Sequence, residues 1–231
     1  MSSLVSLEKV YDKVIFDMDG TLVDSRAVVE AVWRSWALKH GVSADNVLAM
    51  AHGRRTQEVV RQFAPRGIDA DREAREIETG ESDAADNVCA IPGALELVRW
   101  IPDGDWAVVT SATRELAARR LLAAGFRVPE ILVSADDVSV GKPNPEGYLL
   151  AIERMRARPE NCLVFEDAHA GILAAKGAGC DVVAITAARV CDFDAECPAV
   201  PDFHSVSFAM RSAMQPRRWA GRHPSAVALA E

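Results

Sequence analysis

Two aspartates separated by a single residue form the most informative segment of this sequence. They lie in Asp17–Ser25, which reads Asp-Met-Asp-Gly-Thr-Leu-Val-Asp-Ser and directly follows Lys13–Phe16, a short apolar run typical of a buried strand. Crowded carboxylates disfavour joint ionisation, and a divalent cation supplies a reason to keep them together. Acidic turns also occur as plain surface loops, but a strand directly before the pair favours a Mg²⁺ site, because Mg²⁺ takes hard oxygen ligands. Gly20 permits the tight turn that follows.

Three further segments with chemically useful side chains follow in order. The first ends a strand-like run with the hydroxyls of Thr110 and Ser111, which could hold a phosphate oxygen. The second places Lys142 before a helix start, and the third ends a strand-like run in Glu166 and Asp167. Each has a structural alternative: a surface lysine, a strand end, or a pair of helix N-cap acids. Taken together they favour one site, because ligands collect at the carboxyl ends of strands in open α/β sheets.

The elements that must position these segments alternate between strands and helices. This alternation predicts an α/β fold, with a parallel sheet covered by helices. The expected strands are 13–16, 106–110, 131–134, 162–165 and 182–185, and the clearest helical patterns are 114–124 and 145–155.

The alternation is absent between residues 25 and 89, where the pattern predicts an inserted helical region. Val29, Trp33 and Trp36 recur at helical spacing as core residues, and Gly41 follows as a stop. Thr56 could cap a second helix, and the charge-dense stretch 69–87 is expected to form one or two solvated helices. The α/β pattern resumes near residue 91.

Composition limits the classes of function. The chain has 231 residues, 49% of them hydrophobic, and a formal net charge of −8, which argues against a nucleic-acid or membrane-surface binder. The five cysteines include no C-x-x-C pair, which favours reduced thiols over a disulfide framework or a zinc site. No signal peptide and no membrane-spanning run is predicted. We therefore expect a cytoplasmic protein without a nucleic-acid or membrane partner, either a monomer or a weak homo-oligomer.

The four segments, in this order, resemble the four motifs of the haloacid dehalogenase-like superfamily, specifically its phosphatase branch. The resemblance covers nearly the whole chain. It implies a Rossmann-like parallel-sheet core at residues 1–24 and 92–209, with an all-helical cap inserted at 25–91. Residues 210–231, which carry four arginines and little periodicity, are expected to form a flexible tail.

The same resemblance assigns roles in catalysis. Asp17 would be the nucleophile that becomes phosphorylated. Asp19 would be the general acid toward the leaving oxygen and then the general base for water. Ser111 would hydrogen-bond a transferring oxygen, with Thr110 as the adjacent alternative because the register could shift by one residue. Lys142 would neutralise charge on the nucleophile and the phosphoryl group.

The resemblance also implies the remaining contacts of the site. Mg²⁺ would be held by Asp17, Asp167 and the backbone carbonyl of Asp19, with Glu166 ordering a metal-bound water or the lysine. The partner that the resemblance implies is a small phosphorylated metabolite, and Ala112, next to the hydroxyl pair, would be one of the residues that bind it.

A more local resemblance concerns specificity. Residues 52–56 and 106–111 are similar to segments of the glycerol-phosphate and 2-deoxyglucose-6-phosphate phosphatases. The loop around Gly53 would then be the specificity loop, where glycine lets the backbone approach the substrate. Arg54 or Arg55 could face the polar end of the substrate, although both could equally be solvated.

Two other functions remain as alternatives to a phosphatase acting on a small sugar or polyol phosphate. A hexose phosphomutase similar to β-phosphoglucomutase shares core and cap, but such enzymes carry a histidine where this chain has Val29. A noncatalytic metabolite sensor is the second alternative, and the complete set of acidic and basic motif residues argues against it.

Overall fold

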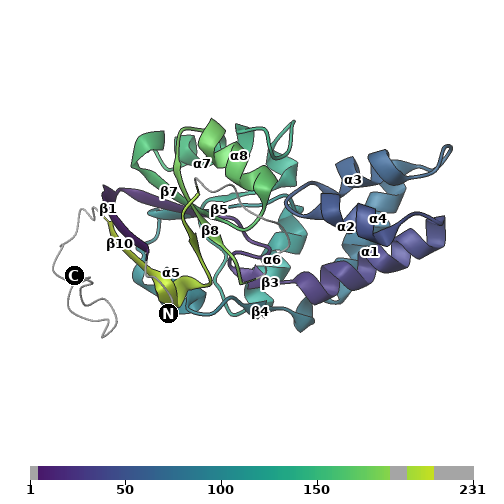
Figure 1. The fold of residues 1–231 in the computed structure, drawn as a ribbon, viewed down its shortest axis with the longest axis horizontal. Coiled ribbons are helices and arrows are strands. Elements are labelled where there is room, and N and C mark those ends of the chain that lie inside the picture. The colour runs from purple at the N-terminus through teal and green to yellow at the C-terminus, as the bar shows by residue number, and fades with distance from the viewer. Residues whose placement is uncertain (1–4, 188–196, 211–231) are drawn as a thin grey trace.

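The computed structural model describes residues 5–187 and 197–210, and a six-stranded parallel sheet runs through their centre (Figure 1). The sheet has the strand order β6-β5-β2-β7-β8-β9. The strands are β1 (Val5–Tyr11), β2 (Lys13–Phe16), β3 (Val23–Asp24), β4 (Cys89–Ala90), β5 (Trp106–Val109), β6 (Leu132–Val133), β7 (Cys162–Glu166), β8 (Asp181–Ile185), β9 (Ala199–Val200) and β10 (Val206–Met210). The helices are α1 (Arg26–His40), α2 (Ala44–Ala51), α3 (Thr56–Phe63), α4 (Ala70–Asp83), α5 (Ala94–Trp100), α6 (Arg114–Ala123), α7 (Glu146–Arg154) and α8 (His169–Gly177).

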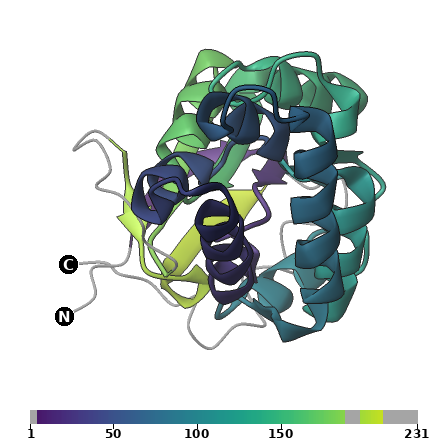
Figure 2. The ribbon, with the colours of Figure 1, turned by 90° about the vertical axis from the view of Figure 1, so that its right-hand side faces the viewer.

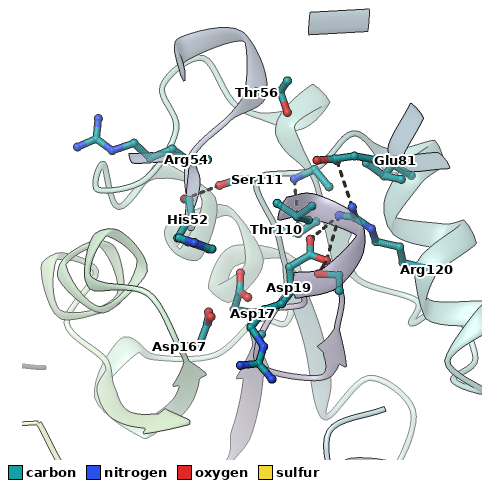
Figure 3. A pocket seen from close by; sticks show the side chains of 18 of the residues that line it. Asp17, Asp19, His52, Arg54, Thr56, Glu81, Thr110, Ser111, Arg120 and Asp167 are labelled. Carbon is teal, nitrogen blue, oxygen red and sulfur yellow. Dashed lines mark hydrogen bonds and ion pairs between the residues drawn. The ribbon is translucent and has the colours of Figure 1, made fainter. Parts of the chain in front are cut away.

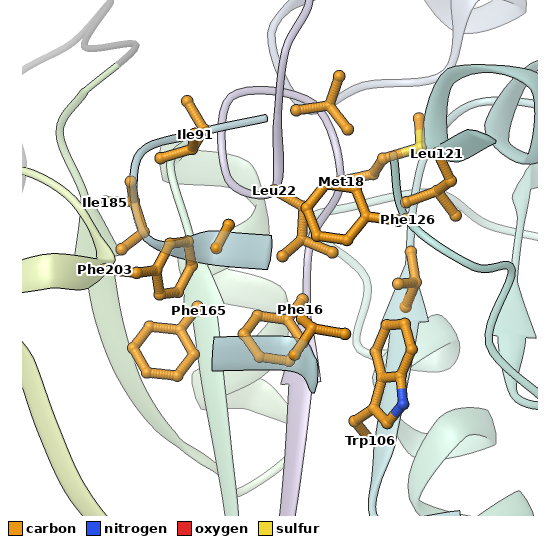
Figure 4. Packing of buried hydrophobic residues seen from close by; sticks show 14 of the residues in the cluster. Phe16, Met18, Leu22, Ile91, Trp106, Leu121, Phe126, Phe165, Ile185 and Phe203 are labelled. Carbon is orange, nitrogen blue, oxygen red and sulfur yellow. The ribbon is translucent and has the colours of Figure 1, made fainter. Parts of the chain in front are cut away.

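Helices cover both faces of this sheet, which confirms the expected α/β class. Side chains alternate along a strand, so Phe16 of β2 packs on the side of α5 and α6, whereas Ile15 packs on the side of α7 and α8. Phe16 stacks on Phe165 with ring centroids 5.4 Å apart (Figure 4). Both faces of the central strands are buried, which is why these strands read as continuous apolar runs.

The helical insert, residues 26–87, leaves the core between β3 and β4. These two short strands pair antiparallel, with Val23 opposite Ala90, and form a two-stranded base for the insert. Helices α1 to α4 pack around a separate hydrophobic cluster that includes Trp33, Trp36 and Val60. Figure 2, viewed from the side of the insert, shows these helices in front of the sheet.

The insert differs from the sequence-based expectation in three places. The sequence did not predict α2, and the helix at Thr56 has Arg55 as its N-cap, so Thr56 is the first helical residue. Helix α4 is not simply solvated, because it buries Ile77 and Glu81. Gly41 ends α1 as predicted, with a positive φ of 65°.

Two further sequence-based expectations concern the C-terminal tail and membrane-spanning helices. The expected tail at 210–231 lies outside the described residues except for Met210, which ends β10. Among the described residues, we find no helix with the length and apolar character that crossing a bilayer would demand.

Candidate active site

The candidate active site lies where the central strands of the sheet end. Phe16, the last residue of β2, pairs with Val108 of β5 and Phe165 of β7. The residues that follow these strands therefore meet at one edge, as ligand-binding residues do in open parallel sheets. Figure 3 shows the predicted side chains that this arrangement brings around one pocket: Asp17, Asp19, Thr110, Ser111 and Asp167.

Lys142 lies beside this pocket in a fully buried ion network. Its Nζ is 2.5 Å from Oδ1 of Asp17 and 2.5 Å from Oε1 of Glu166, and it also donates to the carbonyl of Val109. Burial alone would lower the pKa of Lys142, but the carboxylates of Asp17 and Glu166 raise it above its ordinary value. The side chain is therefore an ammonium ion held against the predicted nucleophile.

Glu166 is occupied by groups of the protein itself. Its Oε1 accepts hydrogen bonds from Lys142 and from the hydroxyl of Tyr148, and its Oε2 accepts from the backbone N–H groups of Asp167 and Ala168. A carboxylate offers about four lone-pair sites, so these four contacts use its acceptor capacity. Glu166 is thereby suited to hold the lysine in place more than to bind a metal directly.

Asp17 and Asp167 form, together with Glu166, a group of buried carboxylates that could hold a cation. One ligand oxygen from each of Asp17, Glu166 and Asp167 lies within 4.8 Å of the others. Burial and the neighbouring carboxylate of Glu166 raise the pKa of Asp17 well above its ordinary value, with Lys142 opposing, and burial followed by Asp17 and Glu166 raises the pKa of Asp167. A divalent cation between Asp17 and Asp167 would favour the ionised form of both.

Gly20 supports this interpretation by its position. Its φ is 84°, and a β-carbon at this residue would overlap the carboxylate of Asp167. Glycine at this turn therefore leaves the volume that the second carboxylate occupies, and the oxygen-only donor set fits Mg²⁺.

Asp19 contacts two polar side chains, those of Ser25 and Arg120. Its Oδ1 accepts a hydrogen bond of 2.7 Å from Ser25, and both of its oxygens lie 3.0 Å from Nη1 of Arg120. The side chain is 28% exposed, in contrast to the buried Asp17. Asp19 is thus the most exposed of the predicted carboxylates that line the pocket.

The hydroxyl pair, Thr110 and Ser111, lies where the core faces the insert. Ser111 donates a hydrogen bond of 2.8 Å to the carbonyl of Gly53, and the hydroxyl of Thr110 accepts one from the N–H of Ala112. All four residues line the same pocket. The predicted phosphate-binding hydroxyl of Ser111 is therefore also a contact between core and insert.

The two candidate arginines of the insert behave differently. Arg54 lines the pocket, although Figure 3 shows its side chain directed away from the carboxylates. Arg55 pairs with Glu58 at 2.5 Å and donates to the carbonyls of Val138 and Ser139 in the core. The structure therefore places Arg55 in a contact between insert and core rather than around the main pocket.

Several pocket residues were not singled out from the sequence, namely His52, Glu81 and Arg120. Burial is the main cause that lowers the pKa of His52, which favours its neutral form. Arg120 had a readable signal, because it falls at helical spacing between Leu116 and Ala124, on the buried face of α6. Glu81 lies in a charge-dense helix, and nothing in its pattern distinguishes it from its neighbours.

Comparison with known proteins identifies the family of this chain. The sequence model of the haloacid dehalogenase-like hydrolases matches residues 11–179. Hexitol phosphatase A of Escherichia coli is 39% identical over 177 residues, which cover 75% of this chain and 82% of that protein. Glycerol-1-phosphate phosphohydrolase 1 of Saccharomyces cerevisiae is 35% identical, covering 78% and 76%, respectively. The crystal structure of a hydrolase from Pseudomonas syringae superposes with a TM-score of 0.68 at 27% identity, over 77% of this chain and 85% of that one. The chain belongs to the haloacid dehalogenase-like hydrolase family.

Proposed function

We propose that this protein is a Mg²⁺-dependent phosphomonoester hydrolase that acts on a small sugar or polyol phosphate through an aspartyl-phosphate on Asp17. The observation that carries the proposal is the buried contact between Lys142 and Asp17, 2.5 Å long, at the edge of a pocket that Asp19 and Asp167 also line. A nucleophile, a cation that neutralises charge and a second carboxylate for proton transfer are the groups that such a reaction needs.

Each residue has a defined role in this reaction. Asp17 attacks phosphorus, and the bond to the leaving oxygen breaks while Asp19 donates a proton to that oxygen. Asp19 then takes a proton from the water that attacks the aspartyl-phosphate, which releases phosphate and restores Asp17. Lys142 neutralises negative charge on Asp17 and on the transferred group, while Ser111 or Thr110 binds a phosphoryl oxygen.

Asp17 and Asp167, with the backbone carbonyl of Asp19, are the groups that would hold Mg²⁺. Their oxygen-only donor set supports this choice, and so does the space that Gly20 leaves beside Asp167. The ion would supply positive charge beside the transferring phosphoryl group. Glu166 would act through Lys142, because its oxygens already accept four hydrogen bonds.

The helical insert would act as a cap that closes the pocket over the substrate. It contributes His52, Arg54 and Glu81 to the pocket lining and has a hydrophobic cluster of its own. Caps of this kind exclude water and select substrates. A sugar or polyol phosphate is supported by the relatives, whose names record a hexitol phosphatase and a glycerol-1-phosphate phosphohydrolase.

A phosphate-release assay with and without the nucleophile tests this proposal. Wild-type protein with Mg²⁺ is expected to release phosphate from p-nitrophenyl phosphate and from members of a panel of sugar, polyol and nucleotide monophosphates. Asp17→Asn should lower kcat/KM by about 10³-fold or more, because the attacking carboxylate is removed. The control is Asp181→Asn, since Asp181 is exposed at the opposite end of the sheet.

Further measurements distinguish the alternatives. Chelation by EDTA should abolish turnover, and added Mg²⁺ should restore it. Mass spectrometry of acid-quenched protein should locate a phosphoryl group on Asp17. Undiminished turnover in Asp17→Asn would refute the mechanism. Formation of glucose 6-phosphate from β-glucose 1-phosphate with little free phosphate would instead support a mutase, and tight binding without turnover across the panel would support a sensor. Val29, which lines the pocket, has no group that could carry a proton and so favours the hydrolase.

A further inference from the structure

A buried arginine joins the helical insert to Asp19. Arg120, on α6 of the core, is 2% exposed, and its Nη1 lies 3.0 Å from both carboxylate oxygens of Asp19. Its Nη2 lies 3.1 Å from Oε2 of Glu81, on α4 of the insert, and Glu81 is itself 4% exposed. One guanidinium therefore contacts a pocket carboxylate and the insert at the same time (Figure 3).

Stability alone does not account for this arrangement. Buried ion networks are frequently no more stable than apolar side chains of similar volume, because every charge must be removed from water. Arg120 also has a buried Nε with no hydrogen-bond partner among the described residues. An unsatisfied buried donor of this kind is destabilising. The arginine is thus better explained by its effect on Asp19.

The contacts of Asp19 show what that effect is. Its Oδ1 accepts hydrogen bonds from Ser25 and from Arg120, which fills the two lone-pair directions of that oxygen. Its Oδ2 accepts from Arg120 alone within the described part of the chain, so one lone pair remains open. The guanidinium thereby fixes the plane of the carboxylate and leaves Oδ2 as the oxygen that can carry a proton.

We propose that Arg120 is a positioning residue for Asp19, and that Glu81 holds Arg120 in place when the insert is seated on the core. This inference rests on the proposed function, in which Asp19 donates a proton to the leaving oxygen. The proton moves from Oδ2 to that oxygen as its bond to phosphorus breaks. The packing of the insert on the core and proton donation by Asp19 would then both depend on the contacts of Arg120. When the insert moves away from the core, Asp19 would be misaligned.

Varying the leaving group of the substrate distinguishes a positioning role of Arg120 from a purely structural one. An alkoxide needs a proton as it departs, whereas p-nitrophenolate departs readily without one. The ratio of kcat/KM for an alkyl phosphate to that for p-nitrophenyl phosphate therefore reports on proton donation. We would use the alkyl phosphate of the panel that the wild type hydrolyses fastest, and the parameter kcat/KM because it covers the departure of the leaving group.

The expected results follow from the size of general acid catalysis, which contributes about 10²–10⁴-fold. Arg120→Met should lower the ratio by roughly 30-fold or more, because a mobile Asp19 retains only part of that contribution. The double variant Arg120→Met/Glu81→Met removes both buried charges and should fold well, yet show the same low ratio. Glu81→Gln keeps the acceptor but weakens the pairing, so its ratio should fall by only about 3–10-fold.

Arg119→Met is the matched control for this series. Arg119 is the adjacent exposed arginine, and it also links the core to α4 through a 3.1 Å hydrogen bond to Ser82, but it does not line the pocket. Its ratio should equal that of the wild type. Thermal unfolding of every variant shows which ones are folded.

Two outcomes would overturn the inference, and they are distinguishable. If the wild type hydrolyses both substrates in an Asp17-dependent reaction but the folded double variant keeps the wild-type ratio, Arg120 does not position the acid. If the wild type hydrolyses no phosphomonoester at all, the proposed function fails and the role of Arg120 fails with it.

Discussion

The pocket has a floor and a roof that are held in place by different interactions. The floor consists of Asp17 and Asp167, which line the pocket, together with Lys142 and Glu166, which are hydrogen-bonded to them. The roof consists of His52, Gly53, Arg54 and Glu81. Floor residues follow paired strands of one sheet or bind directly to residues that do, and Lys142 pairs with two of the three carboxylates. Roof residues belong to helices and loops of the insert, which packs around its own hydrophobic cluster.

This difference implies that the floor carries out the reaction, whereas the roof selects the substrate. The floor is positioned by backbone hydrogen bonds within the sheet, so its geometry does not depend on which substrate is present. The roof is held to the core by a few side-chain contacts, such as those of Arg55, Ser111 and Arg120. Changes in the floor should therefore affect every substrate alike, whereas changes in the roof should act through the seating of the insert or the fit of the substrate.

The largest effect is expected for Lys142→Met, which removes the cation of the floor. The variant should lose about 10³-fold or more in kcat/KM toward alkyl and aryl phosphates alike, because charge neutralisation at phosphorus is needed for any leaving group. Phosphate release with both substrates measures the effect. Lys176→Met, which changes an exposed lysine of α8, is the control and should match the wild type. A loss confined to alkyl phosphates would contradict the separation, because it would give Lys142 a role in the leaving group.

A smaller effect concerns the pH dependence of stability at the contact between insert and core. Burial, followed by the charges of Asp19 and Glu78, raises the pKa of Glu81 to about 7, although Arg120 opposes this. Between the unfolded value near 4.5 and about 7, the folded protein keeps a proton that the unfolded chain has released. The free energy of unfolding should therefore fall as pH rises through this window, by about 1–3 kcal/mol. Urea denaturation at several pH values measures this trend.

Two variants sharpen that measurement. Glu81→Gln should lose this part of the pH dependence, because the amide does not titrate. Glu76→Gln changes an exposed glutamate of the same helix whose pKa is lowered, first by its hydrogen bond from Lys39 and then by Arg72. Glu76 therefore stabilises the fold fully above its unfolded pKa, and this contribution is lost as pH falls through its folded pKa. Its variant should alter the profile in the opposite sense. A wild-type profile in Glu81→Gln would show that Glu81 titrates normally.

The floor could be predicted from the sequence, and physical reasons explain why. Asp17 directly follows an apolar run typical of a buried strand, and Asp167 follows another one residue later; parallel strands bring their carboxyl ends to one edge. Lys142 was recognised by its position before a helix start, in a family resemblance that fixed its role. For Glu166 the resemblance left two roles open, ordering a metal-bound water or ordering the lysine, and the hydrogen bonds around that carboxylate favour the second.

The roof could be predicted only in outline. Helical spacing indicated the insert. The contact of α4 with α6, however, depends on how the insert packs against the core, and no local sequence pattern predicts that. Sequence alone therefore could not separate Arg54 from Arg55, which are adjacent and differ in the partner that packing supplies. Arg120 was readable as a charge on an apolar helix face, whereas its partner Glu81 was not.

The smallest expected effect tests whether Gly53 selects the substrate or seats the insert. Gly53 has a φ of 72°, and a β-carbon there would lie 2.7 Å from the β-carbon of Ala168 in the core. Gly53→Ala should therefore lift the loop from the core and weaken its hydrogen bond from Ser111. We expect a loss of about 10-fold in kcat/KM, close to 1.4 kcal/mol, for p-nitrophenyl phosphate and for the best alkyl phosphate alike.

A second substitution separates the two explanations. Ala168→Gly removes the β-carbon that the new side chain would meet, so Gly53→Ala/Ala168→Gly should recover most of the lost activity, apart from the strain of about 1 kcal/mol that alanine incurs at positive φ. Ala168→Gly alone is the control for the effect of glycine at the start of α8. If Gly53→Ala instead lowers kcat/KM only for the alkyl phosphate, and Ala168→Gly restores nothing, then Gly53 acts on the substrate itself. The roof would in that case select by direct contact, as the sequence-based interpretation of the loop supposed, rather than by how firmly the insert is seated.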